Sequence, residues 1–174
     1  MLLILAIVVL IIAGIVIFAA MQDADFTITR SLDINAPAQQ LYDKIADFHG
    51  WGAWSPFEKL DPAMLKTFSG PAAGVGAAYA WSGNSKIGAG RMKVTEAAPA
   101  SRVAIALDFE RPFAASNIAL FTLAPQGAAT RVTWAMTGKR NLIAKIMSLF
   151  MNMDTMIGGQ FAEGLANLKA LSEK

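Results

Sequence analysis

The sequence predicts an α+β fold in which one apolar helix precedes a seven-stranded, curved antiparallel sheet that packs around one long C-terminal helix. Three observations lead to this prediction. The first 21 residues carry no charged side chain, seven short segments alternate apolar and polar residues, and apolar residues recur at steps of three and four from residue 141 onward. At 174 residues, the chain is long enough for one domain with its own core.

The composition excludes several classes of function. The 15 basic and 13 acidic residues give a net charge of only +2, and no basic stripe is present, which argues against a nucleic-acid partner. The absence of cysteine and the single histidine exclude disulfides, thiolate metal sites and histidine-rich metal sites. The glycines of residues 74–83, GVGAAYAWSG, read as a strand after a turn rather than as a phosphate-binding loop. We therefore expect no metal and no cofactor.

Residues 1–21 predict a transmembrane anchor. As a helix they would extend ~31 Å at ~1.5 Å per residue, about the thickness of the hydrocarbon core of a bilayer. A buried core helix and a cleaved signal peptide are the alternatives. No basic residue precedes the apolar run, and residues 18–22, FAAMQ, form a poor cleavage site, so we favour an uncleaved signal anchor. Residues 22–25 would be a short linker, and we expect the globular part outside the cytoplasm.

A strand and a short helix are predicted next. Apolar and polar residues alternate over residues 26–34, the pattern of a strand with one buried face. Asn35 as a cap and Pro37 in the first turn predict a helix over residues 37–48. Two glycines and a proline in residues 49–59, HGWGAWSPFEK, end this helix in a loop rich in aromatic rings.

Six further strands and one long helix complete the predicted order. Turn signals separate most of the strands, as in an antiparallel meander. The strands are expected at about residues 63–69, 75–82, 87–97, 102–110, 116–124 and 129–138. Residues 141–171 then predict a single amphipathic helix, in which Gly158 and Gly159 indicate a bend or a close contact.

This order of elements resembles the helix-grip fold of the SRPBCC superfamily, which includes START lipid-transfer domains, pollen-allergen-like proteins and the polyketide cyclase/dehydrase group. The segments that carry the likeness are SLDINAPAQQLYDKIADFHGWGAWSPF, SGPAAGVGAAYAWSGN, GAGRMKVTEAAP and MIGGQFAEGLANLKAL. The chain looks most like the bacterial polyketide-cyclase-like members, over residues 26–172, and we assign residues 26–174 to this domain. The resemblance implies a deep pocket between the sheet and the long helix, but a fold does not determine a function.

Strand alternation indicates which side chains would line the implied pocket. The expected lining residues are Trp81, Met92, Ile105, Leu107, Phe109, Leu120, Trp134 and Met136 from the strands, and Met153, Met156, Ile157 and Phe161 from the helix. The loop that contains Trp54 and Phe57 would close one end of the pocket as an apolar lid. Methionines suit a wall that adapts to varied apolar shapes. The alternative is that all these side chains fill a solid core.

Four ionisable residues are candidates for a polar role. His49 is the only histidine and an obvious base, although its place at a helix end favours capping or contact with water. Asp154 lies one step from the apolar stripe; facing inward it would have a raised pKa and serve as an acid or hold a polar head group, and facing outward it would be solvated. Arg91 and Arg111 are candidates for binding an anionic head group.

Together these patterns predict a membrane-anchored module that binds a hydrophobic small molecule or lipid, rather than an enzyme. Two alternatives remain open. One is a polyketide cyclase- or dehydratase-like enzyme that uses Asp154 or His49. The other is an accessory subunit that docks onto a larger membrane complex through the N-terminal helix and exposed rings of Trp51 and Trp54.

Overall fold

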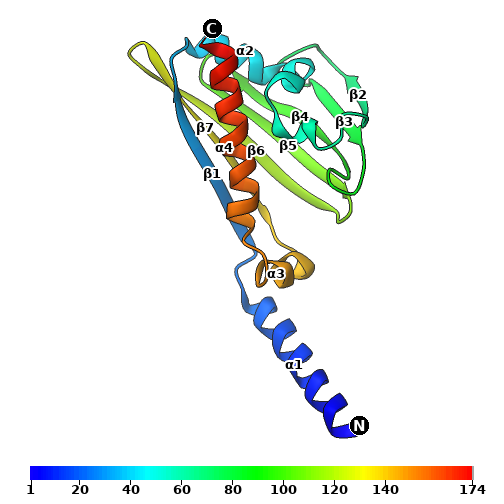
Figure 1. Ribbon diagram of the computed structural model, residues 1–174. Coiled ribbons are helices and arrows are strands. Elements are labelled where there is room, and N and C mark those ends of the chain that lie inside the picture. Colours follow the sequence, from blue (N-terminus) through cyan, green and yellow to red (C-terminus); the bar gives the residue numbers. More distant parts are fainter. Residues whose placement is uncertain (174) are drawn as a thin grey trace.

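The computed structural model describes residues 1–173, so Lys174, the last residue of the expected domain, lies outside the described residues (Figure 1). The helices are α1 (Leu2–Met21), α2 (Ala38–Ala46), α3 (Leu142–Ser148) and α4 (Met153–Ser172), with two 3-10 helices, η1 (Phe48–Ala53) and η2 (Pro56–Lys59). The strands are β1 (Asp25–Ile34), β2 (Leu65–Ser69), β3 (Ala78–Ser82), β4 (Ala89–Ala98), β5 (Arg102–Arg111), β6 (Ala115–Gln126) and β7 (Ala129–Lys139).

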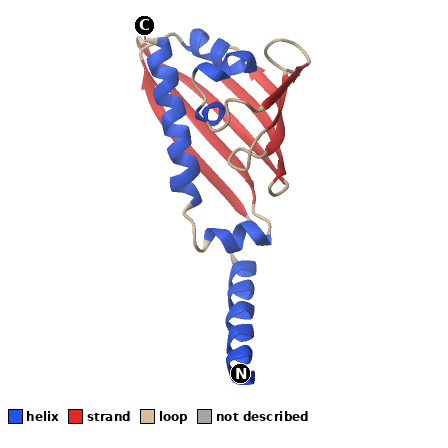
Figure 2. Cartoon of the chain, turned by 45° about the vertical axis from the view of Figure 1, so that its right-hand side comes forward, coloured by secondary structure: helices blue, strands red, loops and turns tan. Residues whose placement is uncertain are grey.

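The seven strands form one antiparallel sheet in the order β1-β7-β6-β5-β4-β3-β2. Strands β2 to β7 follow one another as hairpins, and β1 joins the far edge by pairing with β7, from Asp25 opposite Lys139 to Ile34 opposite Thr130. The sheet curves, and α4 runs along its concave face while α2 and the 3-10 helices lie at one end (Figures 1 and 2). This is the seven-stranded helix-grip arrangement, so the predicted fold is confirmed.

The core occupies the end of the concave face that is covered by α2, η1 and the C-terminal half of α4. Alternate side chains of the strands point into it, as expected for strands with one buried face. The helices contribute Leu41 and Ile45 from α2 and Phe161, Leu165 and Leu168 from α4, all buried. Thr130 is buried as well, and its hydroxyl donates to the carbonyl of Ala36 at 2.8 Å.

The prediction of one helix over residues 141–171 was wrong, because the chain breaks into α3 and α4. An asparagine starts each helix: Asn141 Oδ1 accepts a hydrogen bond from the backbone N–H of Ala144 at 2.8 Å, and Asn152 Oδ1 accepts one from Thr155 at 3.0 Å. These are N-terminal caps. The apolar periodicity continues across residues 149–152 and so concealed the break.

Two smaller expectations about the helices had different outcomes: one was wrong, and one of two alternatives was found for the other. Asn35 does not cap α2, whose first turn starts after Pro37; the backbone N–H of Asn35 instead donates to Glu173 Oε1 at 2.6 Å. Helix α4 continues through Gly158, and a close contact is found there rather than a bend. The Arg30 side chain lies where a Cβ atom of residue 158 would be.

Helix α1 projects away from the sheet and is nearly all exposed (Figure 1). Ala19 is the one buried residue of α1. This arrangement contradicts the alternative of a core helix. By length and composition α1 is long and apolar enough to cross a membrane, and a signal sequence near an N-terminus has the same properties.

Candidate ligand-binding cavity

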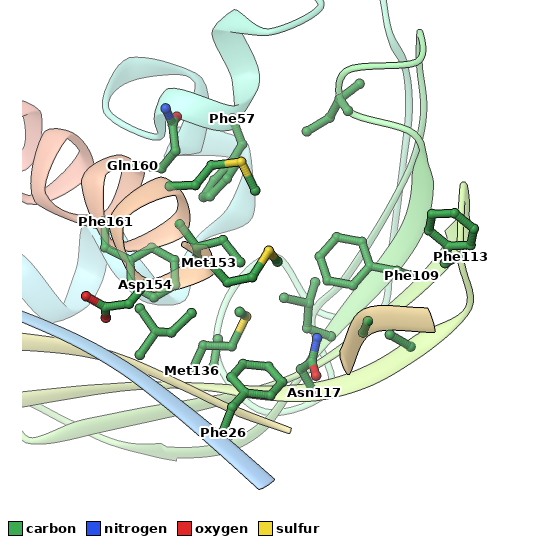
Figure 3. Close-up of a pocket in the computed structure, with 18 of the residues that line it drawn as sticks. Phe26, Phe57, Phe109, Phe113, Asn117, Met136, Met153, Asp154, Gln160 and Phe161 are labelled. Carbon is green, nitrogen blue, oxygen red and sulfur yellow. The ribbon is translucent and has the colours of Figure 1, made fainter. Parts of the chain in front are cut away.

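A cavity of about 1230 Å³ lies between the concave face of the sheet and the N-terminal part of α4 (Figure 3). It is open to solvent on one side and is larger than the ~300–1,000 Å³ typical of small-molecule pockets. Most of its wall is apolar. The sheet supplies Trp81, Met92, Ile105, Leu107, Phe109, Ala119, Trp134 and Met136, and α4 supplies Met153, Met156, Ile157 and Phe161.

The cavity exists because the helices cover only parts of the concave face. Helix α4 packs mainly on β1 at one edge of the sheet, and α2 packs on β5 and β6 near one end. The other half of β4, β5 and β6 is left without a covering element. The side chain of Ala119 on the floor is too small to fill the space.

An aromatic cluster closes the inner end of the cavity. Trp134 stacks on Phe161 with ring centroids 4.2 Å apart, and Phe121 lies 4.7 Å from Trp134. Trp51 and Phe57, from η1 and η2, pack edge-on against Trp134 at 6.4 Å and 6.2 Å. Aromatic pairs of this geometry stabilise a core beyond their buried area.

All of the expected lining residues except Trp54 and Leu120 line this cavity. Trp54 is fully buried behind the wall, 5.7 Å from the ring of Trp134, so it supports the wall instead of facing the space. Leu120 was assigned to the wrong face: the buried residues of β6 are Asn117, Ala119, Phe121 and Leu123, and Leu120 points to the outer side. The alternative of a solid core is contradicted by the cavity itself.

The aromatic loop belongs to the core. Trp51 is buried, and its Nε1 donates to the carbonyl of Ile45 at 3.0 Å. Because Trp51 and Trp54 are both buried, the expectation that these rings are exposed for docking was wrong. His49 lies outside the cavity, with its Nδ1 2.9 Å from Asp47 Oδ1 and its ring stacked on Phe68 at 4.2 Å. It is not among the residues that line the cavity.

Asp154 lies at the cavity edge but is engaged elsewhere. Its Oδ2 accepts from Arg30 Nη2 at 2.9 Å, and Arg30 also donates to the backbone carbonyl of Asp154 at 2.9 Å. In Figure 3 its carboxylate points away from Phe109 and Asn117. The hydrogen bond from Arg30 lowers the pKa of Asp154 below its usual value, which agrees with the outward-facing alternative and not with the inward-facing one. The pair fastens the first turn of α4 to β1.

The two candidate arginines lie in different environments. Arg91 points to the outer face of the sheet, where its Nε is 3.4 Å from Asp108 Oδ2. Arg111 is at the cavity rim, and its Nη2 donates to Ser82 Oγ at 2.8 Å. Of the two, Arg111 is placed to meet a head group at the mouth.

Sequence reasoning missed two polar groups at the cavity wall. The side chain of Glu58 is 8% exposed, and its Oε1 accepts from the hydroxyl of Tyr79 at 2.8 Å while Oε2 pairs with Lys66. Burial, followed by the hydrogen bond to Glu58, raises the pKa of Tyr79. These residues come from η2, β2 and β3, and no sequence spacing indicates that they meet.

Tyr79 is expected to make the domain lose stability in alkaline solution. Its pKa is higher in the folded chain than in the unfolded chain, so its contribution is complete below the unfolded pKa of about 10 and is lost as the pH rises further. Guanidinium unfolding at about pH 9 and about pH 11 should show a smaller loss for Tyr79→Phe than for the natural chain. Tyr42→Phe serves as the control, and an equal loss in Tyr79→Phe would contradict the assignment.

A further polar group, Asn117, lies on the otherwise apolar floor. It is buried, and its Oδ1 accepts no hydrogen bond within residues 1–173. Figure 3 shows its amide beside Met136 and Phe109 at the cavity. A buried amide oxygen that accepts no hydrogen bond costs free energy, which a hydrogen-bond donor on a ligand would recover.

The family model described as polyketide cyclase / dehydrase and lipid transport matches residues 25–173. The chain belongs to this family. The match covers the whole sheet, all of α4 and every cavity-lining residue except Gln22, and it confirms the resemblance drawn from the sequence. The family has a ligand-binding fold, and the cavity described above is the space that this fold encloses. No curated protein matches the chain.

Several solved structures have the same fold as this chain. A protein from Chromobacterium violaceum is 18% identical, with a TM-score of 0.62 over 85% of this chain and 97% of the other. The Aha1 dimer from Colwellia psychrerythraea is 18% identical, with a TM-score of 0.61 over 85% and 96%. The di-domain ARO/CYC StfQ from the steffimycin biosynthetic pathway is 9% identical, with a TM-score of 0.65 over 87% and 51%. At these identities the likeness concerns the fold alone.

Proposed function

We propose that the chain is a membrane-anchored binding module for an apolar small molecule or lipid. Residues 1–21 would be the anchor, residues 22–25 the linker and residues 26–173 the binding domain, on the outer side of the membrane as in a typical signal anchor. The observation that carries the proposal is the apolar cavity of about 1230 Å³, whose boundary includes Gln22 at the end of α1. A ligand that buries about 300 Å² of apolar surface would gain roughly 7 kcal/mol before ordering costs.

Filling the cavity should remove binding without disturbing the outer face of the sheet. Leu107 and Ala119 line the cavity from neighbouring strands, so Leu107→Trp with Ala119→Trp places two indole rings in its centre. Ala106 and Ile118 are paired on the opposite face of the same strands, and Ala106→Trp with Ile118→Trp is the matched control.

The neutral probe N-phenyl-1-naphthylamine, excited directly, reports binding to the full chain in detergent. We expect saturable emission for the natural chain and the control, and at least about tenfold weaker binding, or ~1.4 kcal/mol, for the filled variant. Equal binding by the filled variant would contradict the cavity as the binding site.

A second candidate function, a cyclase- or dehydratase-like reaction, is favoured by Glu58 and Tyr79. The Tyr79 hydroxyl, protonated at neutral pH as in any tyrosine, is a hydrogen-bond donor at the cavity wall, and the carboxylate of Glu58 that accepts from it is a potential proton acceptor. His49 does not line the cavity, and Asp154, at its edge, is paired with Arg30. The test is incubation of the full chain with a poly-β-ketone thioester mimic, followed by mass spectrometry for loss of water.

The variants Tyr79→Phe and Glu58→Gln separate the two functions. If the chain is an enzyme, both variants should lose turnover while they still bind the fluorescent probe. A binding module would give no dehydrated or cyclised product with the natural chain, and its probe binding would be similar in all three proteins.

A further inference from the structure

Helix α3 and the three residues after it expose an unusual amount of apolar surface. Residues 142–151, LIAKIMSLFM, contain one charged side chain, Lys145, and no residue of α3 is buried. The large exposed side chains are Leu142, Ile143, Leu149, Phe150 and Met151, and Phe150 is 73% exposed. We call residues 142–151 the α3 lip. Contiguous exposed apolar patches of this kind mark interaction surfaces.

Polar contacts hold the α3 lip at the C-terminal end of α1. Lys145 Nζ donates to the carbonyl of Ala20 at 3.3 Å, and Arg140 Nη2 donates to the carbonyl of Asp23 at 2.9 Å. The backbone N–H of Arg140 donates to the carbonyl of Ala24 at 2.7 Å. The cation of Lys145 thus meets one of the last carbonyls of α1, which is a favourable place for positive charge.

This attachment sets the depth of the lip relative to a bilayer. Helix α1 has 20 residues, which at ~1.5 Å per residue gives ~30 Å, the thickness of the hydrocarbon core. When α1 spans the membrane, its end at Met21 lies at the boundary between acyl chains and head groups. The α3 lip, side by side with that end in Figures 1 and 2, lies at the same level.

The lip also forms one side of the cavity mouth. Ala144, Ser148, Leu149 and Phe150 belong to the cavity boundary, together with Gln22 at the end of α1. The opposite side of the mouth is the turn between β5 and β6, where Phe113 is exposed. The apolar cavity therefore opens at the level where α1 ends.

We propose that the α3 lip inserts into the interfacial region of the bilayer beside α1 and that apolar ligands pass over it between membrane and cavity without crossing water. The partner is the lipid surface itself. Exposed aliphatic and aromatic side chains around a lysine are the composition of an interfacial helix, whose apolar face is buried among the acyl chains. The exchange step rests on the proposed binding function, whereas the insertion does not.

Single-cysteine labelling tests the insertion, because the chain has no natural cysteine. Phe150→Cys, labelled with an environment-sensitive fluorophore, is reconstituted as the full chain in phosphatidylcholine vesicles that contain spin-labelled lipid. The control is Val75→Cys, exposed in the loop where the Gly74 N–H bonds to the carbonyl of Ala46 at the end of α2, far from α1. Gly14→Cys, with open space around it, reports on α1.

The expected result is blue-shifted emission and strong quenching at positions 150 and 14, with neither at position 75. Quenching at position 14 without quenching at position 150 would contradict insertion of the α3 lip and would leave α1 as a membrane anchor. No quenching at position 14 would contradict both the membrane span of α1 and the insertion of the α3 lip beside it. Emission at position 150 that is blue-shifted but not quenched by spin-labelled lipid would show a protein partner on the patch and would also overturn the proposal.

Ligand exchange is tested separately. Leu142→Glu with Ile143→Glu, two exposed residues of the lip that do not line the cavity, should slow transfer of N-phenyl-1-naphthylamine from vesicles to the protein several-fold, with equilibrium binding in detergent unchanged; Val75→Glu is the control. Unchanged transfer overturns the exchange route. If the natural chain binds no probe, the binding function fails, and the exchange route fails with it, while the quenching result still decides the insertion.

Discussion

Replacing Trp134 with alanine is expected to destabilise the domain by about 3–5 kcal/mol, the usual cost of removing a large buried aromatic side chain. Trp134 is 3% exposed and lies at the centre of the aromatic cluster, stacked on Phe161 of α4 and next to Phe121 of β6. Its loss would detach α4 from the sheet at the inner end of the cavity. Guanidinium unfolding of the full chain in detergent, followed by far-ultraviolet circular dichroism, measures the change.

Two further variants show whether packing is the cause. Ile118→Ala, on the outer face of the neighbouring strand, should change the free energy of unfolding by less than about 1 kcal/mol. Trp134→Phe keeps a ring and removes an indole N–H that has no hydrogen-bond acceptor in the described part of the chain, so its loss should be smaller than that of alanine. A Trp134→Ala variant as stable as Ile118→Ala would contradict the role of the cluster.

Replacing Gly158 with alanine should make the domain less stable than replacing its neighbour Gly159, by up to about 1 kcal/mol. A Cβ atom at residue 158 would overlap the guanidinium of Arg30, which would have to leave its pairing with Asp154. A Cβ atom at residue 159 meets open space. Both substitutions gain the same helix propensity, ~1 kcal/mol, so their difference isolates the cost of moving the exposed Arg30 side chain out of its ion pair, for which about 0–1 kcal/mol is usual.

Thermal unfolding of both glycine variants in the same detergent gives this difference. Gly159→Ala should be at least as stable as the natural chain. Equal stability of the two variants would mean that Arg30 yields without cost, and that its contacts with Asp154 do not fasten α4 to β1.

The strands other than β2 were predictable because one face of each is buried, whereas all five residues of β2 are exposed. The alternation of Val103, Ile105, Leu107 and Phe109 in β5, for example, indicates which face of this strand turns toward the core. The alternation of side chains along each strand then identifies most of the residues that line the cavity. It failed at Leu120, because β6 alternates large apolar residues on both faces, and a side chain of that size gives no sign of which face is buried.

The helices showed the limit of periodicity. The stripe that continues from Ile143 through Phe150 to Phe161 was interpreted as one helix face against the sheet. In the structure the first part is exposed beside α1 and the last part packs on Trp134. Apolar spacing indicates that a face will be covered, but not by which surface.

Contacts between distant segments were beyond sequence reasoning. Glu58 and Tyr79 meet at the cavity because η2 folds over the edge of the sheet, and Trp54 moves behind the wall because η1 turns it inward. The sequence left both orientations of Asp154 open, and its pairing with Arg30, a residue 124 positions away in the chain, decides for the outward one. Each outcome depends on the tertiary arrangement and on no local pattern.

Native mass spectrometry of the full chain, released from detergent after incubation with mixed lipids and isoprenoids, tests the existence of a binding cavity most directly. One apolar molecule should remain bound to the natural chain and to the Ala106→Trp, Ile118→Trp variant, and should be absent from the Leu107→Trp, Ala119→Trp variant. A natural chain that stays empty across these mixtures, or a filled variant that retains the same molecules, would contradict the proposal that this family member holds an apolar ligand between its sheet and α4.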